Sequence, residues 1–397
     1  MEPGRPRRLV GGRAIDRGRA RLLGAAAILA LLAECQPAPS TMPTNFGTPS
    51  PRAAVQTAIP PGGPLPIDPA SIELHLLDAR YVPADRPVST GSEVIWIGGD
   101  AGPSEIWRYV PGAGAPERIL AGQHPDAAIT ALTGSSAGYA FIEESPSAFG
   151  RGGWRLWFLA VPGGVQLEVD RGTAPGAGVA PTLAMDDRRM AWAAFDEPSG
   201  GPVSRLKVES VGAPGTAMTL IDAPIRDRKL WDPALSGTQL WYATIEPDPN
   251  GVADEFHIEQ LDLTRPEAPP TVFPGLGRDF DPAVNARFVV WKTTEPDDSA
   301  LNWGALHVLD RQSGAATPIA VAKANRPSLG DRFVAFDEIT HTRLVVYDLA
   351  TQRLVELRRS AAATPTYGGA SVSGSLLSFF VQDSAGQPRI GWANLPE

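Results

Sequence analysis

The sequence is poor in the residues that stabilise small folds and build metal centres. It has one cysteine and five histidines among 397 residues, so an intrachain disulfide is excluded. No CxxC, HxxxH or HExxH motif occurs, and the sequence therefore offers no zinc site. Sialidase-type Asp boxes of the form SxDxGxTW are also missing. Beyond residue 71 no segment has the period of an amphipathic helix, which excludes a helical bundle.

The composition instead favours many short elements. There are 41 glycines, 40 prolines and 10 tryptophans, and 43% of the residues are hydrophobic. Glycine and proline at this frequency end strands and form turns, while the hydrophobic fraction is ample for a packed core. One large all-β domain is therefore favoured over two or three average domains.

Charge is distributed unevenly along the chain. The formal net charge is -9, but the first 35 residues hold seven arginines against three acidic residues, a local balance of +4. The remaining residues therefore carry -13. Because such an acidic surface repels a phosphate backbone, nucleic-acid binding is disfavoured.

Residues 1–35 have the organisation of a secretory signal. The apolar run LLGAAAILALLA, residues 22–33, follows a basic start and would make about 18 Å of helix, less than the roughly 30 Å core of a bilayer. It ends in LAEC, which resembles a bacterial lipobox and implies lipidation at Cys35. Glu34 stands where a lipobox has Gly, Ala or Ser, so plain secretion, an uncleaved anchor or a chance cysteine are alternatives. In each case the protein is expected outside the cytoplasm, on the cell surface, in the periplasm or secreted.

Residues 36–67 separate this signal from the folded part. They contain nine prolines and almost no charge. Such a segment cannot bury enough apolar surface to fold, so it is predicted to be a disordered stalk. The folded domain is expected at residues 68–397.

The folded part repeats with a period of about 47 residues. The segment DPAVNARFVVW, residues 281–291, has a near copy 49 residues upstream in DPALSGTQLWY, residues 232–242. Aromatic residues continue the series at positions 96, 141, 192, 242, 291, 336 and 379. A fixed period of this size predicts a solenoid or a propeller.

Each unit predicts four antiparallel strands, the first beginning at the proline. A turn separates it from a run such as FVVW, and alternating runs such as TRLVVYDL and TPIAV follow. The seventh unit stops at NLPE after three strands, while residues 71–79, SIELHLLDA, predict a strand without a unit. The predicted fold is therefore an all-β, seven-bladed β-propeller of four-stranded antiparallel blades, closed by an N-terminal strand that completes the last blade.

This pattern resembles the TolB-like and WD-repeat-like propellers of bacterial envelope proteins, across essentially all of residues 71–397. The resemblance is architectural, because turns such as NAR, SGT and GDR replace the SPDG turn of TolB repeats. It implies a β-propeller lipoprotein of the envelope but does not carry over TolB's own partners.

Charged residues recur in the loops after the second strands and in the connections between blades, which share one face of a propeller. The predicted ligand-face residues are Asp196, Trp231, Asp232, Asp279, Asp281, Glu295, Arg326 and Asp337. A mostly acidic face with a few arginines suits a basic or polar partner. Acids and prolines also form turns and blunt strand edges, so a structural role remains an alternative for each residue.

One loop has the spacing of a calcium site. In EPDPNGVADE, residues 246–255, the pattern DxDxDGxxD is approached by Glu246, Asp248, Asn250 and Asp254. Oxygen ligands at alternate positions can wrap a hard cation. No cofactor is predicted apart from calcium as a possibility, which is implied by the resemblance of this loop to the calcium loops of FG-GAP propeller repeats. An ordinary acidic hairpin loop is the alternative, because the motif occurs once and contains two prolines.

No catalytic residue is predicted. GSSAG, residues 134–138, matches the GxSxG of serine hydrolases, but the following YAFIEE predicts a strand where that motif needs a helix. Trp96, Trp192 and Trp291 occupy equivalent repeat positions, which predicts packing between blades.

The sequence thus predicts a non-catalytic extracytoplasmic scaffold, a monomer that binds an envelope or extracellular protein or peptide and reaches the membrane only through a lipid anchor. The alternative is a secreted propeller enzyme, a lactonase- or lyase-like hydrolase with a metal in the central channel. An enzyme would bring acids or histidines from several blades together at the axis, whereas a scaffold would show only a charged rim. Purely structural envelope support is a third alternative.

Overall fold

The computed structural model describes residues 68, 71–77, 86–99, 103–122, 124, 126–174, 180–213, 215–248, 254–273, 277–294, 303–359 and 365–397. They belong to the compact unit Ala54–Glu397. The predicted signal with Cys35, the stalk, Asn250 and Glu295 lie outside the described residues. Within these ranges no helix has the length and apolar character that crossing a membrane requires.

Most strands form four-stranded antiparallel sheets in which each strand pairs with the next along the chain. The sheet β2 to β5 comprises Val88–Ser89, Val94–Gly98, Glu105–Tyr109 and Glu117–Ala121. The sheet β6 to β9 comprises Ala128–Ser135, Gly138–Glu144, Gly153–Leu159 and Gln166–Thr173, with the short helix α2 (Pro146–Phe149) after β7. The sheet β10 to β13 comprises Thr182–Met185, Arg189–Asp196, Val203–Ser210 and Met218–Pro224, and the sheet β14 to β17 comprises Lys229–Ser236, Gln239–Glu246, Glu255–Asp262 and Thr271–Phe273.

A seven-stranded sheet follows, in which one long strand belongs to two units. β21 (Ala315–Leu329) pairs with β20 through its first half and with β22 through its second half. The linking residues AVAK, 320–323, contain no glycine or proline that would break the strand. The other strands are β18 (Arg278–Val284), β19 (Phe288–Thr294), β20 (Gly304–Asp310), β22 (Phe333–Glu338), β23 (Arg343–Asp348) and β24 (Arg353–Arg359).

The two ends of the described chain meet in the last sheet. It contains β25 (Thr366–Ser373), β26 (Leu376–Gln382), β27 (Pro388–Asn394) and β1 (His75–Leu76). β1 is antiparallel to β27, with His75 opposite Trp392 and Leu76 opposite Gly391. The rings of His75 and Trp392 also stack, with centroids 4.1 Å apart.

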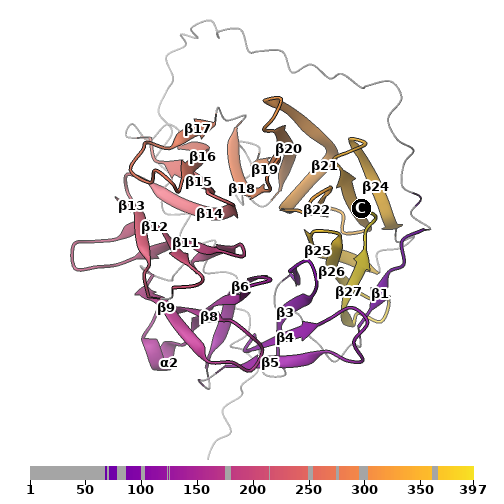
Figure 1. Ribbon diagram of the computed structural model, residues 1–397, viewed down its shortest axis with the longest axis horizontal. Coiled ribbons are helices and arrows are strands. Elements are labelled where there is room, and N and C mark those ends of the chain that lie inside the picture. Colours follow the sequence, from indigo (N-terminus) through magenta and orange to yellow (C-terminus); the bar gives the residue numbers. More distant parts are fainter. Residues whose placement is uncertain are drawn as a thin grey trace, which may run out of the picture. The chain divides into compact units, whose positions relative to one another are not determined.

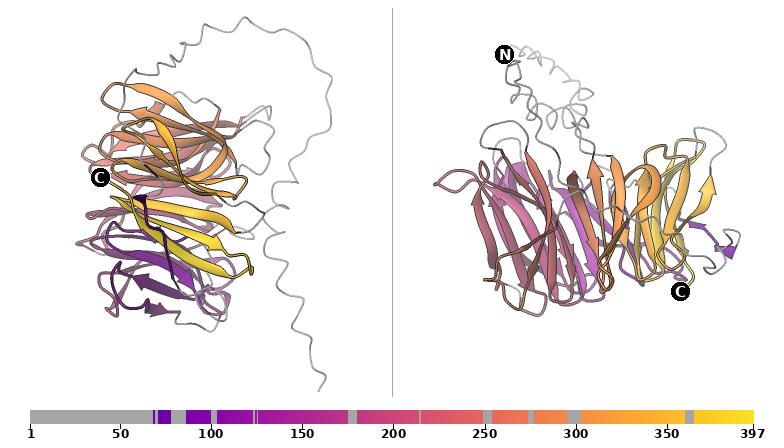
Figure 2. Two further views of the ribbon diagram at one scale, coloured as in Figure 1. Left: turned by 90° about the vertical axis from the view of Figure 1, so that its right-hand side faces the viewer. Right: turned by 90° about the horizontal axis from the view of Figure 1, so that it is seen from above.

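The sheets are arranged radially about a common centre, with the first strand of each unit innermost (Figure 1). The side views in Figure 2 show the strands of successive sheets running along the central axis. Several four-stranded antiparallel sheets in this arrangement form a β-propeller, which confirms the predicted all-β fold class.

The hydrophobic core lies between neighbouring sheets, as predicted from the repeat. Trp192 of β11 packs with side chains of the preceding sheet such as Leu156, and Trp291 of β19 packs with residues of β15 and β16. Trp96 of β3 packs with Leu376 and Trp392 of the last sheet. A buried large apolar side chain contributes about 1.5–3 kcal/mol, so these residues hold adjacent sheets together.

Candidate functional site

Four of the innermost strands have a β-bulge at the position of the repeated sequence feature. Register shifts occur between Trp231 and Ala234, between Phe280 and Ala283, between Asn325 and Ser328, and between Gly368 and Ser371. The prediction that these strands begin at the proline is wrong, because β14 and β18 begin before Pro233 and Pro282 and contain them. Proline is tolerated there because a bulge interrupts the ladder and needs no N–H donor.

The residue before the proline has left-handed backbone geometry. The φ angles are 45° at Asp232, 50° at Asp281 and 49° at Arg326, and Gly369 has φ of 59° at the corresponding place. Glycine adopts this geometry without a steric penalty, and aspartate can offset the penalty through a local hydrogen bond of its short side chain. The long side chain of arginine does not offer this stabilisation. Three adjacent units thus place a charged side chain at the same point of the innermost strand.

Two of these side chains are in direct contact. The carboxyl groups of Asp232 and Asp281 are hydrogen-bonded to each other. Lys292 Nζ lies 2.6 Å from Asp281 Oδ2 and donates a 2.7 Å hydrogen bond to Asn325 Oδ1. The Lys292 side chain is only 4% exposed and that of Asp281 is 24% exposed, so the ammonium group depends on the Asp281 carboxylate for charge balance.

The position of Lys292 makes the two carboxyl groups unequal. Burial raises the pKa of Asp232 well above its ordinary value, and the nearby charge of Asp281 raises it further. Burial acts in the same direction on Asp281, but Lys292 and the hydrogen bond with Asp232 outweigh it, and the pKa of Asp281 is lowered. The pair therefore retains one proton, on Asp232, over a range in which isolated aspartates are ionised.

Two arginines and a third carboxyl group complete the cluster. Arg86, which precedes β2, donates a 3.0 Å hydrogen bond from Nη1 to the carbonyl oxygen of Arg326, 240 residues away. Burial raises the pKa of Asp337 even though Ala370 N donates to its Oδ1 at 3.1 Å and Arg326 and Arg86 act in the opposite direction. The axial cluster is defined here as Arg86, Asp232, Asp281, Lys292, Arg326 and Asp337.

A glycine makes room for Arg86. Gly369 occupies the left-handed position of β25, and a Cβ atom there would lie 2.9 Å from the Cβ of Arg86. Any other residue would clash with Arg86 and also strain its own backbone. The last unit thus has a glycine where the three preceding units have a charged residue, and this glycine leaves space for Arg86.

Two of the predicted ligand-face residues are bound to other strands, Asp196 to its own sheet and the preceding one and Asp279 within its own sheet. Asp196 accepts a 2.9 Å hydrogen bond from Thr173 N, and its Oδ2 lies 2.9 Å from Arg205 Nη1. Asp279 is buried and accepts a 2.5 Å hydrogen bond from Thr293 Oγ1. Neither residue belongs to the axial cluster. Asp232, Asp281, Arg326 and Asp337 do, and the structure therefore brings together four of the eight predicted residues.

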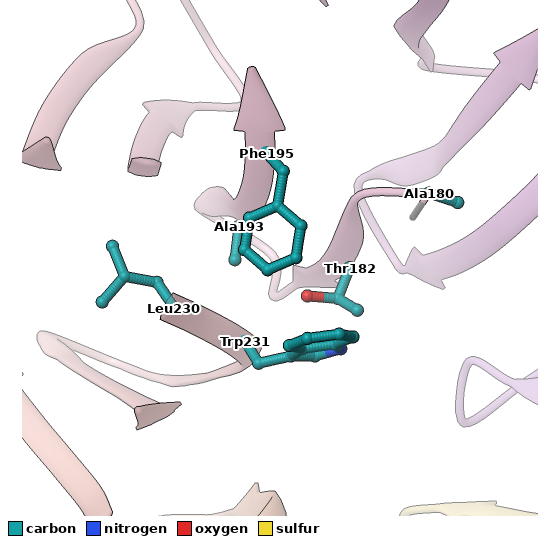
Figure 3. Close-up of a pocket in the computed structure, with 6 residues that line it drawn as sticks. All are labelled: Ala180, Thr182, Ala193, Phe195, Leu230 and Trp231. Carbon is teal, nitrogen blue, oxygen red and sulfur yellow. The ribbon is translucent and has the colours of Figure 1, made fainter. Parts of the chain in front are cut away.

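Trp231, which directly precedes Asp232 in the sequence, lines a recess (Figure 3). The recess is lined by Ala180, Thr182, Ala193, Phe195 and Leu230 and has a cavity volume of about 10 Å³. The Phe195 ring meets the indole edge-on, with centroids 5.1 Å apart. Ligand pockets usually enclose about 300–1,000 Å³, so the recess by itself is too small for a drug-sized ligand.

Sequence reasoning missed Lys292. The residue after the repeat aromatic is apolar in five units, at Ile97, Ile142, Ala193, Ala243 and Phe380, but is Lys292 or Asp337 in the other two. The pairing partners of Lys292 and Asp337 are Phe280 and Asn325, immediately before the bulges. A charged residue at a repeat position that is otherwise apolar is therefore the sequence signal that would have identified Lys292.

At the predicted calcium loop, the structure places Glu246 next to two residues that were not predicted as ligands, Glu255 and His257. Glu246 ends β15 and faces Glu255 of β16, and the ligand atoms of Glu246, Glu255 and His257 lie within 4.8 Å of one another. Arg228 Nε is 3.4 Å from Glu246 Oε1 and competes for that carboxylate. Two carboxylates and an imidazole could hold a metal ion, and this mixed donor set suits a transition metal better than calcium. Asp254 precedes β16, and Glu255 is 71% exposed on its side chain.

The GSSAG segment forms a hairpin. β6 and β7 meet at Ser135 and Gly138, which pair with each other, and a strand follows the motif as predicted. A nucleophile elbow needs a strand, a sharp turn and a helix, so this segment does not have that geometry.

Comparisons with known proteins extend the fold assignment. No protein-family model and no curated protein sequence matches the chain. The β-propeller domain of the trilobed protease from Pyrococcus furiosus matches with a TM-score of 0.53 at 10% identity, over 80% of this chain and 93% of that one. A prolyl endopeptidase matches with a TM-score of 0.54 at 14% identity, over 77% of this chain and 46% of that one, so the chain spans less than half of that enzyme.

TolB from Acinetobacter baumannii is a weaker match. Its TM-score is 0.40 at 13% identity, over 77% of each chain, which is too distant to support an inference. At such identities the likenesses show a β-propeller and nothing about activity.

Proposed function

We propose that the protein is a non-catalytic extracytoplasmic binding scaffold that holds a protein or peptide partner on the face around the ring centre. The observation that carries this proposal is the axial cluster, in which charged side chains from three units and from Arg86 converge at the bulges of the innermost strands. Left-handed bulges hold these side chains in fixed positions. Such preorganisation lowers the entropic cost of ordering a binding surface.

We infer seven blades closed by β1. Support comes from β21, whose two halves would serve as the outer strand of one blade and the inner strand of the next. The β1–β27 pairing would supply the fourth strand of the last blade. This ring would leave only short sheet edges, which favours a monomer.

The proposed location follows from the N-terminal sequence. A signal at residues 1–35, lipidation at Cys35 and a Pro-rich stalk would display the propeller outside the cytoplasmic membrane, as a lipoprotein on the cell surface or in the periplasm. Metabolic labelling with a radioactive fatty acid, in the protein and in a Cys35→Ser variant, tests this. Label that persists in the variant would contradict lipidation at Cys35.

The second candidate is a propeller enzyme, because acids of two units, Asp232 and Asp281, are in contact near the axis and Asp337 of a third unit belongs to the same cluster. The pair Asp232 and Asp281 has one protonated and one ionised carboxyl group, which is the pattern of an acid–base pair. However, Asp281 is held by Lys292, whose ammonium group would oppose a metal ion at that carboxylate. The residues at the axis therefore do not fit a catalytic metal, and the scaffold is the better-supported function.

Capture from an envelope extract tests the proposal. The full-length protein is immobilised beside an Arg326→Asn variant, which removes the exposed guanidinium while keeping a residue that tolerates left-handed backbone. We expect a discrete partner on the wild-type protein and a weaker band on the variant. Arg287→Gln is the matched control, because Arg287 lies in the β18–β19 turn, at the opposite end of these strands, and pairs there with Asp310 at 2.8 Å. Equal capture by the wild-type and Arg326→Asn proteins would contradict the proposed face.

A further inference from the structure

We infer that the protein binds one neutral sugar unit in a cavity between the two halves of the seven-stranded sheet. The site is distinct from the axial cluster, and the inference goes beyond the proposed binding of a protein or peptide. Its basis is a buried tyrosine hydroxyl without a hydrogen-bond partner, together with the charge balance, the size and the mixed lining of the cavity around it.

The Tyr347 cavity is defined by five residues from the two halves of this sheet. They are Phe288 of β19, Val308 of β20, Thr317 of β21, Tyr347 of β23 and Leu349, which follows β23. Val308, Tyr347 and Leu349 also belong to the hydrophobic core between the two halves, and Phe288 packs against that core. The cavity is therefore a gap at the edge of the packed core and not a surface depression on one strand.

The hydroxyl group of Tyr347 has no partner inside the protein. Tyr347 is only 5% exposed, yet its hydroxyl makes no hydrogen bond to any group in the part of the chain that the structure describes. Tyr139 and Tyr242 are buried to the same degree, and each donates a 2.6 Å hydrogen bond to a glutamate. Buried tyrosine hydroxyls usually find such a partner, because an unsatisfied polar group costs free energy. Burial raises the pKa of Tyr347, so the hydroxyl stays protonated at neutral pH and can donate to a ligand in the cavity.

The charges around the cavity cancel, which favours a neutral ligand. Among the described residues that line it, only Arg287 and Asp310 are charged, and Arg287 Nη2 and Nε donate to Asp310 Oδ2 at 2.8 and 3.3 Å. The carboxylate of Asp348, the residue after Tyr347, is 2.9 Å from Arg332 Nη2. Since these charges are used on each other, no ligand contact is assigned to them, and an ionic ligand would find no counter-charge.

The size of the cavity suits a single ring. Its volume is about 100 Å³, and the residues at its mouth, Ser313, Ala315 and Gln352, are exposed. A water molecule needs about 10–15 Å³, an apolar cavity of about 150 Å³ holds a benzene ring, and drug-sized ligands use about 300–1,000 Å³. The cavity therefore admits one ring and leaves the remainder of a larger ligand outside the mouth.

The lining combines apolar side chains with hydroxyl groups. Phe288, Val308 and Leu349 offer carbon surface, whereas Thr317 and Tyr347 offer hydroxyls that can both donate and accept. A sugar ring has the same two characters, because its carbon-bound hydrogens are apolar and its hydroxyls form hydrogen bonds. A purely apolar ring would leave the hydroxyls of Thr317 and Tyr347 unsatisfied.

The experiment titrates the full-length protein with methyl glycosides of neutral hexoses and N-acetylhexosamines, by calorimetry and by thermal shift. We expect at least one glycoside to bind and to raise the melting temperature, and the corresponding charged glucuronide to bind more weakly. Tyr347→Phe and Thr317→Val should each weaken binding by about threefold to tenfold, because each removes one hydrogen bond. Oligosaccharides of the same sugar identify the source: tighter binding than the methyl glycoside indicates a glycan end, equal binding indicates a free sugar, and both support the inference.

Tyr109→Phe is the matched control. Tyr109 pairs with Val94, two residues before the repeat aromatic Trp96, just as Tyr347 pairs with Val334 before Phe336, but Tyr109 does not line the cavity. This variant should bind the glycoside like wild type. Tyr347→Phe should not lower the melting temperature of the unliganded protein, because its hydroxyl makes no bond there, so lost binding is not lost folding.

Four outcomes would overturn the inference: no glycoside binds at tens of millimolar, the glucuronide binds as tightly as the neutral glycoside, Tyr347→Phe and Thr317→Val both keep wild-type affinity, or Tyr347→Phe alone is clearly destabilised. Failure here leaves the scaffold proposal standing, because the envelope capture experiment tests a different site. Capture that depends on Arg326 together with no glycoside binding would refute only the sugar site.

Discussion

Replacement of Asp232 and Asp281 in turn by asparagine should have unequal effects, although the two carboxyl groups are hydrogen-bonded to each other. The Asp232→Asn change would keep a neutral side chain that can donate to Asp281, as the protonated Asp232 does. The Asp281→Asn change would remove the carboxylate that lies 2.6 Å from the ammonium group of Lys292, whose side chain is 4% exposed. Breaking a buried ion pair from one side costs about 3 kcal/mol or more, so Asp281→Asn should be the destabilising change. Asp232→Asn should cost less than about 1 kcal/mol at neutral pH.

The contributions of Asp232 and Asp281 to the free energy of unfolding should depend on pH in opposite directions. The raised pKa of Asp232 means that its stabilising contribution is present below the ordinary aspartate pKa and is lost as pH rises through the folded-state value. The Asp232→Asn variant lacks this loss, so its stability relative to wild type should increase with pH, by about 1.4 kcal/mol for each unit by which the pKa is raised. The lowered pKa of Asp281 gives a contribution that is present above the ordinary pKa and is lost as pH falls. The cost of Asp281→Asn should therefore shrink in acid.

Equilibrium unfolding in urea, at several pH values between about 3 and 9, measures both differences. Asp310→Asn is the matched control, because Asp310 pairs with the exposed Arg287 and that surface pair should contribute less than about 1 kcal/mol. The reasoning is refuted if Asp232→Asn is as destabilising as Asp281→Asn at neutral pH. A stability difference between Asp232→Asn and wild type that does not change with pH would refute the assignment of the shared proton.

Three further changes test the bulges and the loop after β15. Gly369→Ala should lower the melting temperature by an amount equivalent to about 1–3 kcal/mol, because its Cβ would lie 2.9 Å from that of Arg86 at φ of 59°; an unchanged melting curve would contradict this. Arg326→Gly should raise the free energy of unfolding by up to about 1 kcal/mol, because it relieves the left-handed strain at φ of 49°, and a loss of stability would show that Arg326 is structural. Millimolar calcium should raise the melting temperature if the loop of Glu246 and Asp254 binds it, and Asp254→Asn should abolish the rise; calorimetry without any rise would exclude the calcium loop.

Part of the site could be predicted because some of its residues occupy equivalent positions in successive copies of the repeat. Asp232 and Asp281 occupy the same place in two copies of one sequence, and equivalent positions in a radial fold must lie on the same face. Arg326 and Asp337 follow by the same reasoning. Sequence could not predict which of these side chains touch, because that depends on the bulge, whose left-handed residue is recognised only from the backbone.

What the sequence determined by itself is local and periodic. The alternation of apolar residues within each unit predicts strands, the spacing of the aromatics predicts stacked units, and both effects depend on neighbours close in the chain. The tertiary structure alone decided the axial cluster, since it joins Arg86 to Arg326 across 240 residues and sets Lys292 against Asp281. Only the curvature of the ring brings these groups within reach, and their mutual burial decides which carboxyl group keeps a proton.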